Sequence, residues 1–244
     1  MTRCAVIVFA KAPQAGFAKT RLIAALGAQG AAMLAERLMC ATLEHALEAD
    51  IGPVELCVTP DRTHPAFAVA AQHGSINLSD QGEGDLGERM ARAFERVLCS
   101  HDRALLIGTD APRLDAPYLR TAAQALNEAD AVFGPTADGG YALVGLRRPA
   151  LELFTGMCWS NDQVMAHTRT RLVASRMRHV ELPLLYDIDE PADLCHLPAQ
   201  WLREAELTRS HRPDDTALLP IGDATTSAPR LESPRHDQRS RSRP

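Results

Sequence analysis

The chain has 244 residues, of which 45% are hydrophobic and 23% are charged, so it can bury a core without help from disulfides or metal ions. Its formal net charge is −5 at pH 7, which argues against a general nucleic-acid-binding protein because such proteins need a basic face. No uninterrupted apolar run approaches the roughly 18 residues of a membrane-spanning helix. We therefore expect neither a membrane nor a nucleic acid as a partner.

Apolar runs alternate with helical patterns along most of the chain. In chain order we expect a strand at 3–10, a helix at 29–48, a strand at 53–59, a helix at 63–72, a strand at 75–79, a helix at 86–98, a strand at 103–108, a helix at 117–127, strands at 129–135 and 141–146, a helix at 161–175, extended pieces at 178–182 and 185–188, and a short helix from 190. Strands that alternate with helices predict an α/β three-layer sandwich around a mostly parallel sheet.

The composition changes near residue 202. Residues 1–202 are predicted to form the α/β domain, whereas residues 203–244 are rich in Pro, Ser, Thr, Arg and Asp. Such a composition buries too little apolar surface to offset the entropy of ordering, which predicts a disordered tail. Its Arg-Ser-Arg-Ser-Arg end (239–243) is either solvated or touches a nucleic acid.

The six cysteines are scattered without a C-x-x-C pair, which is typical of reduced, mostly buried thiols in a cytoplasmic protein. The nine histidines show no metal spacing, and neither a Ser/His/Asp set nor a G-x-S-x-G turn occurs. A zinc site and serine-hydrolase chemistry are therefore not expected.

A basic Pro/Gly loop follows the first predicted strand. The chain has 26 basic residues but only two lysines, Lys11 and Lys19, and both lie in this loop, together with Gly16 and Arg21. A lysine is a compact, flexible point charge that suits a phosphate, and ligands of open α/β sheets bind beyond the carboxyl ends of the strands. The loop is therefore a candidate phosphate-binding segment; the alternative is a solvated surface loop.

Two known phosphate motifs compete with this interpretation. A Walker A loop fails, because the sequence before Lys19-Thr20 lacks the required glycines. A literal G-x-G-x-x-G occurs at residues 82–87, but it follows the weakest predicted strand and carries two acidic residues where a pyrophosphate would lie. We favour Asp85 as the N-cap of the next helix with Glu88 as its capping-box partner, which leaves Arg89 free to point at a ligand.

Carboxylates follow two of the apolar segments. Asp110 comes just after the strand at 103–108, and Asp187 and Asp189 would point to the same side of an extended segment. Three carboxylates suit Mg²⁺, a cation that carries substrate phosphates. The alternatives are an N-cap or Asx turn for Asp110 and a cap on the following helix for Asp189.

A third landmark is the Gly-rich segment 134–141. Gly139 and Gly140 allow a backbone to come close to a ligand, and Asp138 projects from the same turn; a tight hairpin explains these residues equally well. Trp159 is either the anchor of a lid or the apolar neighbour of a helix N-cap at Ser160, and we favour the second.

Five ordered motifs together resemble the DUF2064 family, also called rSAM/selenodomain-associated transferase 1. They are FAKAPxxGxxKTRL at 9–22, DLGERM at 85–90, IGTDAP at 107–112, GPxxDGGY at 134–141 and DIDEPxD at 187–193. The family belongs to the nucleotide-diphospho-sugar transferase superfamily with a GT-A-like fold. Phospholactate guanylyltransferases are more distantly similar, and molybdenum-cofactor guanylyltransferases share the basic loop and the aspartate after a strand.

The resemblance implies a role for each motif residue. Metal ligands for Mg²⁺ or Mn²⁺ would be Asp110, Asp187 and Asp189, and catalytic residues Lys19, Arg21, Asp110 and Asp138. Nucleotide-binding residues would be Ala10, Lys11, Gly16, Lys19, Thr20, Arg21, Leu86, Arg89 and Thr109. Substrate-binding residues would be Asp138, Gly139, Gly140 and Trp159.

Two chemistries remain open for such a transferase. The dense Lys/Arg loop favours nucleotidyl transfer from a nucleoside triphosphate to a small phosphorylated or carboxylate acceptor with release of pyrophosphate, because a triphosphate needs several cations. The alternative is a glycosyltransferase with a nucleoside-diphosphate-sugar donor, in which Asp138 would be the base. A lesser alternative is a nucleotide-binding protein without turnover. Whether the chain forms a homodimer stays open.

Overall fold

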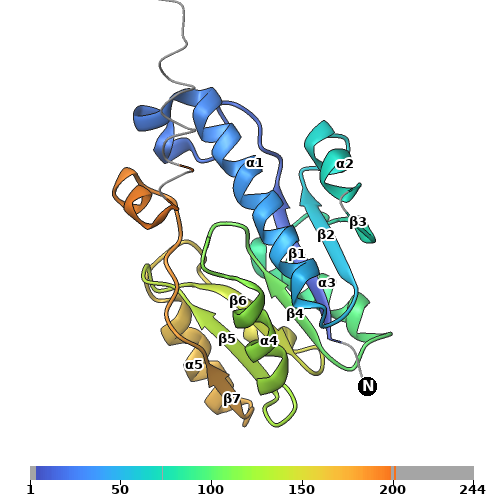
Figure 1. Cartoon of the computed structure of the whole chain (residues 1–244). Coiled ribbons are helices and arrows are strands. Elements are labelled where there is room, and N and C mark those ends of the chain that lie inside the picture. Colours follow the sequence, from blue (N-terminus) through green and yellow to red (C-terminus); the bar gives the residue numbers. More distant parts are fainter. Residues whose placement is uncertain (1–3, 73, 199–200, 202–244) are drawn as a thin grey trace, which may run out of the picture. The chain divides into compact units, whose positions relative to one another are not determined.

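The computed structural model describes residues 4–72, 74–198 and 201, and within them seven strands form one sheet in the order β3-β2-β1-β4-β6-β5-β7 (Figure 1). The strands are β1 Ala5–Lys11, β2 Val54–Thr59, β3 Ile76–Asp80, β4 Ala104–Ile107, β5 Ala131–Pro135, β6 Tyr141–Leu146 and β7 His179–Glu181. The central strands β1 and β4 are almost continuously apolar because both faces of the sheet are covered.

Four of the six strand pairings in the described sheet are parallel. Strand β6 is the exception, since it runs antiparallel to both β4 and β5. The connection from β5 to β6 has only five residues, 136–140, and a parallel crossover needs a dozen or more. The predicted mostly parallel sheet is confirmed, with one reversed strand inside it.

Helices cover both faces of the sheet and complete the three layers. They are α1 Ile23–Ala49, α2 Pro65–Ala71, α3 Leu86–Leu98, α4 Ala116–Ala125 and α5 Val164–Ala174, with short 3₁₀ helices η1 Thr20–Leu22, η2 Leu151–Leu153 and η3 Pro191–His196. Helices α1, α2 and α4 pack on one face, through residues such as Met39, Phe67 and Leu119. Helices α3 and α5 pack on the other, through residues such as Phe94 and Leu172.

A third, smaller apolar cluster joins segments far apart in the sequence. Leu22, Leu34 and Leu38 from η1 and α1 pack against Ile188 and Leu197 near the end of the described chain. Burying these side chains holds the 187–197 segment against the loop that follows β1. This contact places two of the predicted acidic residues beside the basic loop.

Several predicted element boundaries are wrong, each for a local reason. The helix expected from residue 29 begins at Ile23, and it includes a kink at Gly27, whose φ is 74°. The helix expected from 161 begins at Val164 because Ser160 has a φ of 63° and is not the N-cap. The extended piece at 185–188 makes only one parallel bridge, from Leu185 to Thr136.

The capping and cysteine expectations differ in outcome. Asp85 and Glu88 form the predicted capping box at the start of α3, and α4 has the predicted proline in its first turn. All six cysteines are free thiols, but three of them are exposed, so the expectation of mostly buried thiols is wrong.

One described helix, Thr20–Ala49, meets the length and composition criteria for a membrane span, criteria that core helices of soluble proteins also meet. In this structure its buried side chains contact the sheet and neighbouring helices. The predicted tail at 203–244 lies outside the described residues.

Candidate functional site

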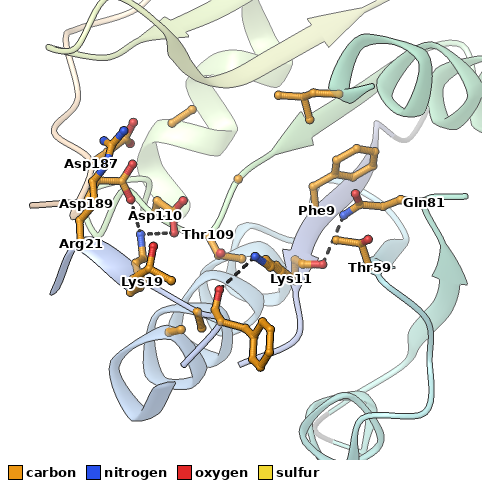
Figure 2. A pocket seen from close by; sticks show the side chains of 18 of the residues that line it. Phe9, Lys11, Lys19, Arg21, Thr59, Gln81, Thr109, Asp110, Asp187 and Asp189 are labelled. Carbon is orange, nitrogen blue, oxygen red and sulfur yellow. Dashed lines mark hydrogen bonds and ion pairs between the residues drawn. The ribbon is translucent and has the colours of Figure 1, made fainter. Parts of the chain in front are cut away.

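A cavity of about 510 Å³ opens beyond the carboxyl ends of the parallel strands β1, β2, β3 and β4. Lys11 ends β1, Thr59 ends β2, Gln81 follows β3, and Thr109 and Asp110 follow β4; all five line it (Figure 2). Carboxyl ends of parallel strands lie at one edge of a sheet, which is where open α/β sheets bind ligands. We call this cavity the first pocket.

Lys19 occupies the charged end of the first pocket. Its Nζ lies 2.6 Å from Oδ1 of Asp110 and 2.9 Å from Oδ1 of Asp189, and only 7% of its side chain is exposed. Burial alone would lower the pKa of Lys19, but the two carboxylates outweigh it and raise the pKa above its ordinary value. Lys19 is therefore a buried, charged ammonium group held at the mouth of the sheet (Figure 2).

Asp187 is a second unusual charge at this end. Its Oδ1 is buried and has no hydrogen-bond partner in the described residues. Burial, followed by the neighbouring carboxylates of Asp110, Asp138 and Asp189, raises the pKa of Asp187 to about 7. A carboxylate in these surroundings would be stabilised by a cation.

The backbone explains how the two segments meet. The amide of Ile188 donates a hydrogen bond of 2.9 Å to the carbonyl oxygen of Asp110, and the Ile188 side chain is buried in the third cluster. Asp187 and Asp189 flank this anchor, so both reach the pocket. Lys19 has a left-handed backbone with φ and ψ of 47°; the loop needs this turn to bring its side chain inward.

The opposite end of the first pocket is less charged. Phe9, Thr59 and Gln81 lie there (Figure 2), and the buried Gln81 amide donates to the carbonyl oxygens of Ala10 and Cys57, which ties the loop after β3 to the ends of β1 and β2. The surface between the two ends carries Lys11, whose Nζ bonds the carbonyl oxygen of Phe17 at 3.0 Å.

A second pocket of about 310 Å³ adjoins the first. Asp110, Tyr141, Asp187 and Asp189 line both cavities, so a molecule in one lies beside a molecule in the other. The part that belongs to the second pocket alone includes Asp138 on the β5–β6 turn, and Trp159 and Asn161 before α5.

The structure brings most of the predicted site residues together. The first pocket is lined by Ala10, Lys11, Lys19, Thr20, Arg21, Leu86, Arg89, Thr109, Asp110, Asp187 and Asp189. The second is lined by Asp138, Gly140 and Trp159, besides those it shares. Gly16 and Gly139 line neither pocket. Both have positive φ values, +85° and +89°, so their glycines serve the turns.

Three alternatives can now be judged. Asp189 is not the cap of η3, because Glu190 occupies that position and the Asp189 carboxylate pairs with Lys19. Asp138 closes its turn, accepting from the Thr136 hydroxyl at 2.5 Å and the Gly140 amide at 3.0 Å, and also lines the second pocket. Arg89 lines the first pocket, where its Nε donates to the carbonyl oxygen of Gly84 and its Nη1 to Oε1 of Gln81 at 3.5 Å.

Sequence patterns missed Phe9 and Gln81 as pocket residues. Phe9 looks like any residue of a buried strand, and its place at the carboxyl end is the only sequence signal. Gln81 directly precedes the glycines of the G-x-G-x-x-G pattern, and the interpretation of that pattern gave no reason to single out Gln81.

The carboxylates at the charged end of the first pocket meet some of the requirements of a divalent-cation site and not others. Among the described residues, no group of three or more His, Cys, Asp or Glu side chains is arranged to hold a metal ion, because Lys19 Nζ lies between Asp110 and Asp189. The unpartnered, buried Asp187 Oδ1 beside these two carboxylates is nevertheless the oxygen-rich surrounding that Mg²⁺ prefers.

Comparison with known proteins identifies a matching family model and similar folds. Residues 42–161 match the model of the family described as "Uncharacterized protein conserved in bacteria (DUF2064)". The DUF2064 match includes Asp110, Asp138 and Trp159, whereas Lys19, Asp187 and Asp189 lie outside it.

Solved structures extend the likeness beyond the DUF2064 match. A protein from Desulfovibrio desulfuricans G20, provisionally named a nucleotide-diphospho-sugar transferase, is 28% identical with a TM-score of 0.77, over 88% of this chain and 100% of that one. A nucleotidyl transferase from Methanothermobacter is 16% identical with a TM-score of 0.57, over 83% and 99% of the chains. The inositol-1-phosphate CTP transferase of T. maritima is 12% identical with a TM-score of 0.52, over 88% and 99%. The fold is therefore GT-A-like. No curated protein matches the sequence.

Proposed function

We propose that the chain is a nucleotidyltransferase that binds a nucleoside triphosphate in the first pocket and transfers its nucleotidyl group to a small acceptor in the second. The observation that carries this proposal is Lys19, an ammonium group buried at the carboxyl edge of the sheet between two carboxylates. An enzyme that moves a nucleotidyl group needs fixed positive charge around the phosphates, since positioning and charge stabilisation supply most of the catalysis.

The pocket suggests one direction for the nucleotide. Its triphosphate would lie at the end where Lys19 and Arg21 lie, with Lys11 along its path, and its nucleoside near Phe9 and Gln81 at the other end. Arg21 supports this orientation because two thirds of its side chain is exposed and its partner, Glu190, is 3.6 Å away, so the guanidinium can exchange that weak pair for a phosphate.

A divalent cation, Mg²⁺ or Mn²⁺, would be held by Asp110, Asp187 and Asp189 and would neutralise phosphate charge. Lys19 would then release at least one of its two carboxylates, and the incoming phosphates offer its ammonium group a new partner. Binding of the cation and of the nucleotide would thus favour each other.

In the reaction, an acceptor oxygen would attack the α-phosphorus, a new P–O bond would form, and the bond to the β-phosphate would break with pyrophosphate as the leaving group. Lys19 and Arg21 would stabilise the charge that accumulates on the departing pyrophosphate. Asp138 lines the second pocket and can accept the acceptor's proton.

Glycosyl transfer from a nucleoside-diphosphate sugar is the second candidate. The same placement of Asp138 favours it, because an inverting glycosyltransferase needs a carboxylate base beside the acceptor, and the Desulfovibrio protein carries a nucleotide-sugar name.

Binding of the four nucleoside triphosphates and common nucleoside-diphosphate sugars, and turnover of each with a panel of small sugar, polyol, phosphate and carboxylate acceptors, with and without Mg²⁺, separate the candidates. Tight triphosphate binding with Mg²⁺-dependent release of pyrophosphate supports nucleotidyl transfer; a preference for a sugar nucleotide with release of the nucleoside diphosphate supports the second candidate. Binding without turnover would contradict both.

Asp110→Asn is the matched variant for this experiment. It should lower turnover by about 10²-fold or more, the typical effect of losing one electrostatic stabiliser, while the protein stays folded. Asp115→Asn is the control, since Asp115 caps α4 away from both pockets and asparagine caps helices equally well. Wild-type turnover in Asp110→Asn would contradict the assignment of Asp110.

A further inference from the structure

The second pocket differs sharply from the first in its charge. The first is lined by four basic side chains, Lys11, Lys19, Arg21 and Arg89, besides the carboxylates of Asp110, Asp187 and Asp189. Among the described residues that line the second there is no Lys, Arg or His, and four carboxylates line it, those of Asp110, Asp138, Asp187 and Asp189. Lys19, and the divalent cation of the proposed function, reach the carboxylates of Asp110, Asp187 and Asp189 from the side of the first pocket. No cation among the described residues pairs with Asp138, so the lining stays negative.

An anionic molecule would be repelled in this pocket. Asp138 is exposed, and its carboxylate has no basic partner in the described residues. A triphosphate in the first pocket adds further negative charge along the shared border. Like charges a few ångströms apart in a partly buried site repel each other strongly, so phosphate and carboxylate groups are poorly accommodated.

Besides the polar side chains of Thr136, Ser160 and Asn161, the remaining wall has a rigid aromatic face. Trp159 and Tyr141 meet edge to face with ring centroids 6.5 Å apart, and Tyr141 meets Phe133 in the same manner at 5.2 Å. Gly87 lies behind the indole, where an added Cβ would come within 2.8 Å of the Trp159 ring. Met90 and Val164 are buried beside this wall. The aromatic side chains therefore have little freedom to move.

An aromatic wall opposite carboxylates suits one class of small molecule. A sugar or polyol has C–H groups that pack on aromatic rings, and hydroxyl groups that donate to carboxylates. It also brings no charge into an acidic pocket, and its hydroxyl oxygen is the nucleophile that the proposed reaction needs.

We propose that the second pocket binds the acceptor and that the acceptor is a neutral sugar or polyol without phosphate or carboxylate groups. This inference rests on the proposed function, and it replaces the phosphorylated or carboxylate acceptor expected from the sequence. A hydroxyl oxygen of the acceptor attacks the α-phosphorus of the triphosphate. The P–O bond to the acceptor forms, the bond to pyrophosphate breaks, and the hydroxyl proton passes to Asp138.

The test uses Trp159 as a reporter. The chain has two tryptophans, so Trp201→Phe leaves Trp159 as the single fluorescent indole. Matched pairs are titrated: glucose with glucose 6-phosphate, ribose with ribose 5-phosphate, and inositol with inositol 1-phosphate. Each titration is done with and without Mg²⁺ and a non-hydrolysable triphosphate. At least one neutral member should change the Trp159 signal and bind at least about tenfold more tightly than its phosphate ester.

Two variants decide whether charge is the cause. Asp138→Asn keeps the oxygen that closes the turn but removes one charge, and should reduce the preference for the neutral member several-fold. Asp162→Asn removes a charge from an exposed residue that does not line the pocket, and should leave the preference unchanged.

Trp159→Ala, followed by calorimetry, should weaken binding of the neutral member about tenfold.

A phosphate ester that binds more tightly than its neutral partner, or no response to any of the six compounds, would overturn the inference. Triphosphate binding measured in the same samples separates the two proposals. If the triphosphate binds and the sugars do not, the acceptor inference fails and the proposed function stands; if the triphosphate does not bind, the proposed function fails.

Discussion

Lys19 differs from an ordinary lysine in its burial and in how its charge is held. Its side chain is buried, yet two carboxylates keep it charged. As long as it bridges Asp110 and Asp189, it occupies the position from which these oxygens would approach a divalent cation. Lys11, the other lysine, is exposed, and within the described part of the chain its ammonium group donates to the backbone carbonyl of Phe17. Under the proposed function both lysines would bind phosphate, but Lys19 alone would also compete with the divalent cation for its carboxylates.

Lys19→Ala should weaken triphosphate binding about tenfold or more, and should strengthen Mn²⁺ binding in the absence of nucleotide about tenfold, because the freed carboxylates repel each other until a cation joins them. Calorimetry or electron paramagnetic resonance measures both. Lys11→Ala is the control: it should weaken the triphosphate and leave Mn²⁺ binding unchanged. Unchanged Mn²⁺ affinity in Lys19→Ala would show that Lys19 does not compete with the cation.

Titration of Asp187 should make the free energy of unfolding depend on pH. Its folded-state pKa is raised to about 7 from an ordinary value of 3.8, with burial as the largest cause. Between these values the folded protein keeps a proton that the unfolded chain has lost, so the contribution is fully present below about pH 4 and is lost as the pH rises to about 7.

Urea denaturation of the wild-type protein in EDTA should show this loss as a decrease of roughly a few kcal/mol in the free energy of unfolding. Asp187→Asn should reduce the decrease, since an amide does not titrate, and Asp102→Asn, at an exposed site, should not. Identical pH profiles for Asp187→Asn and the wild type would contradict the assigned burial of Asp187.

At the scale of elements, the turn between β5 and β6, which lines the second pocket, is hydrogen-bonded to helix α5. The carbonyl oxygen of Gly139 accepts a hydrogen bond of 2.8 Å from the amide of Met165 in the first turn of α5. Gly139 has a φ of +89°, and an added Cβ would overlap the backbone of Asp162. The glycine is therefore required twice, by its backbone conformation and by the close approach.

Gly139→Ala should lower the free energy of unfolding by about 1–3 kcal/mol more than Gly156→Ala, the range for overpacking. Gly156 also has a positive φ, +63°, but an added Cβ there meets open space, so its substitution measures backbone strain alone. Urea denaturation of both variants gives the comparison. Equal losses would mean that the contact between the turn and α5 carries no stability.

At the scale of the whole molecule, local features could be predicted from the sequence, whereas contacts between residues far apart in the sequence could not. The capping box at Asp85 and Glu88 depends on residues three apart, and the mostly parallel sheet follows from the alternation of strands and helices. The pairing of Lys19 with Asp189 joins residues 170 positions apart, and it depends on the burial of Ile188 against η1 and α1.

Motif residues were found because each follows a strand, but their partners were set by packing. No spacing in the sequence could indicate that Lys19 lies between Asp110 and Asp189 or that Arg89 bonds Gly84. The charge of each pocket was equally hidden, because it depends on which carboxylates the fold gathers around Tyr141 and Trp159.

The division of charge between two adjoining pockets is the central feature of the molecule, and a crystal structure with a non-hydrolysable triphosphate and Mn²⁺ tests it most directly. The phosphates should lie within hydrogen-bond distance of Lys19 in the first pocket, and the anomalous signal of Mn²⁺ should lie between them and the carboxylates of Asp110 and Asp189. A triphosphate bound away from Lys19, or in the acidic second pocket, would contradict the proposed function.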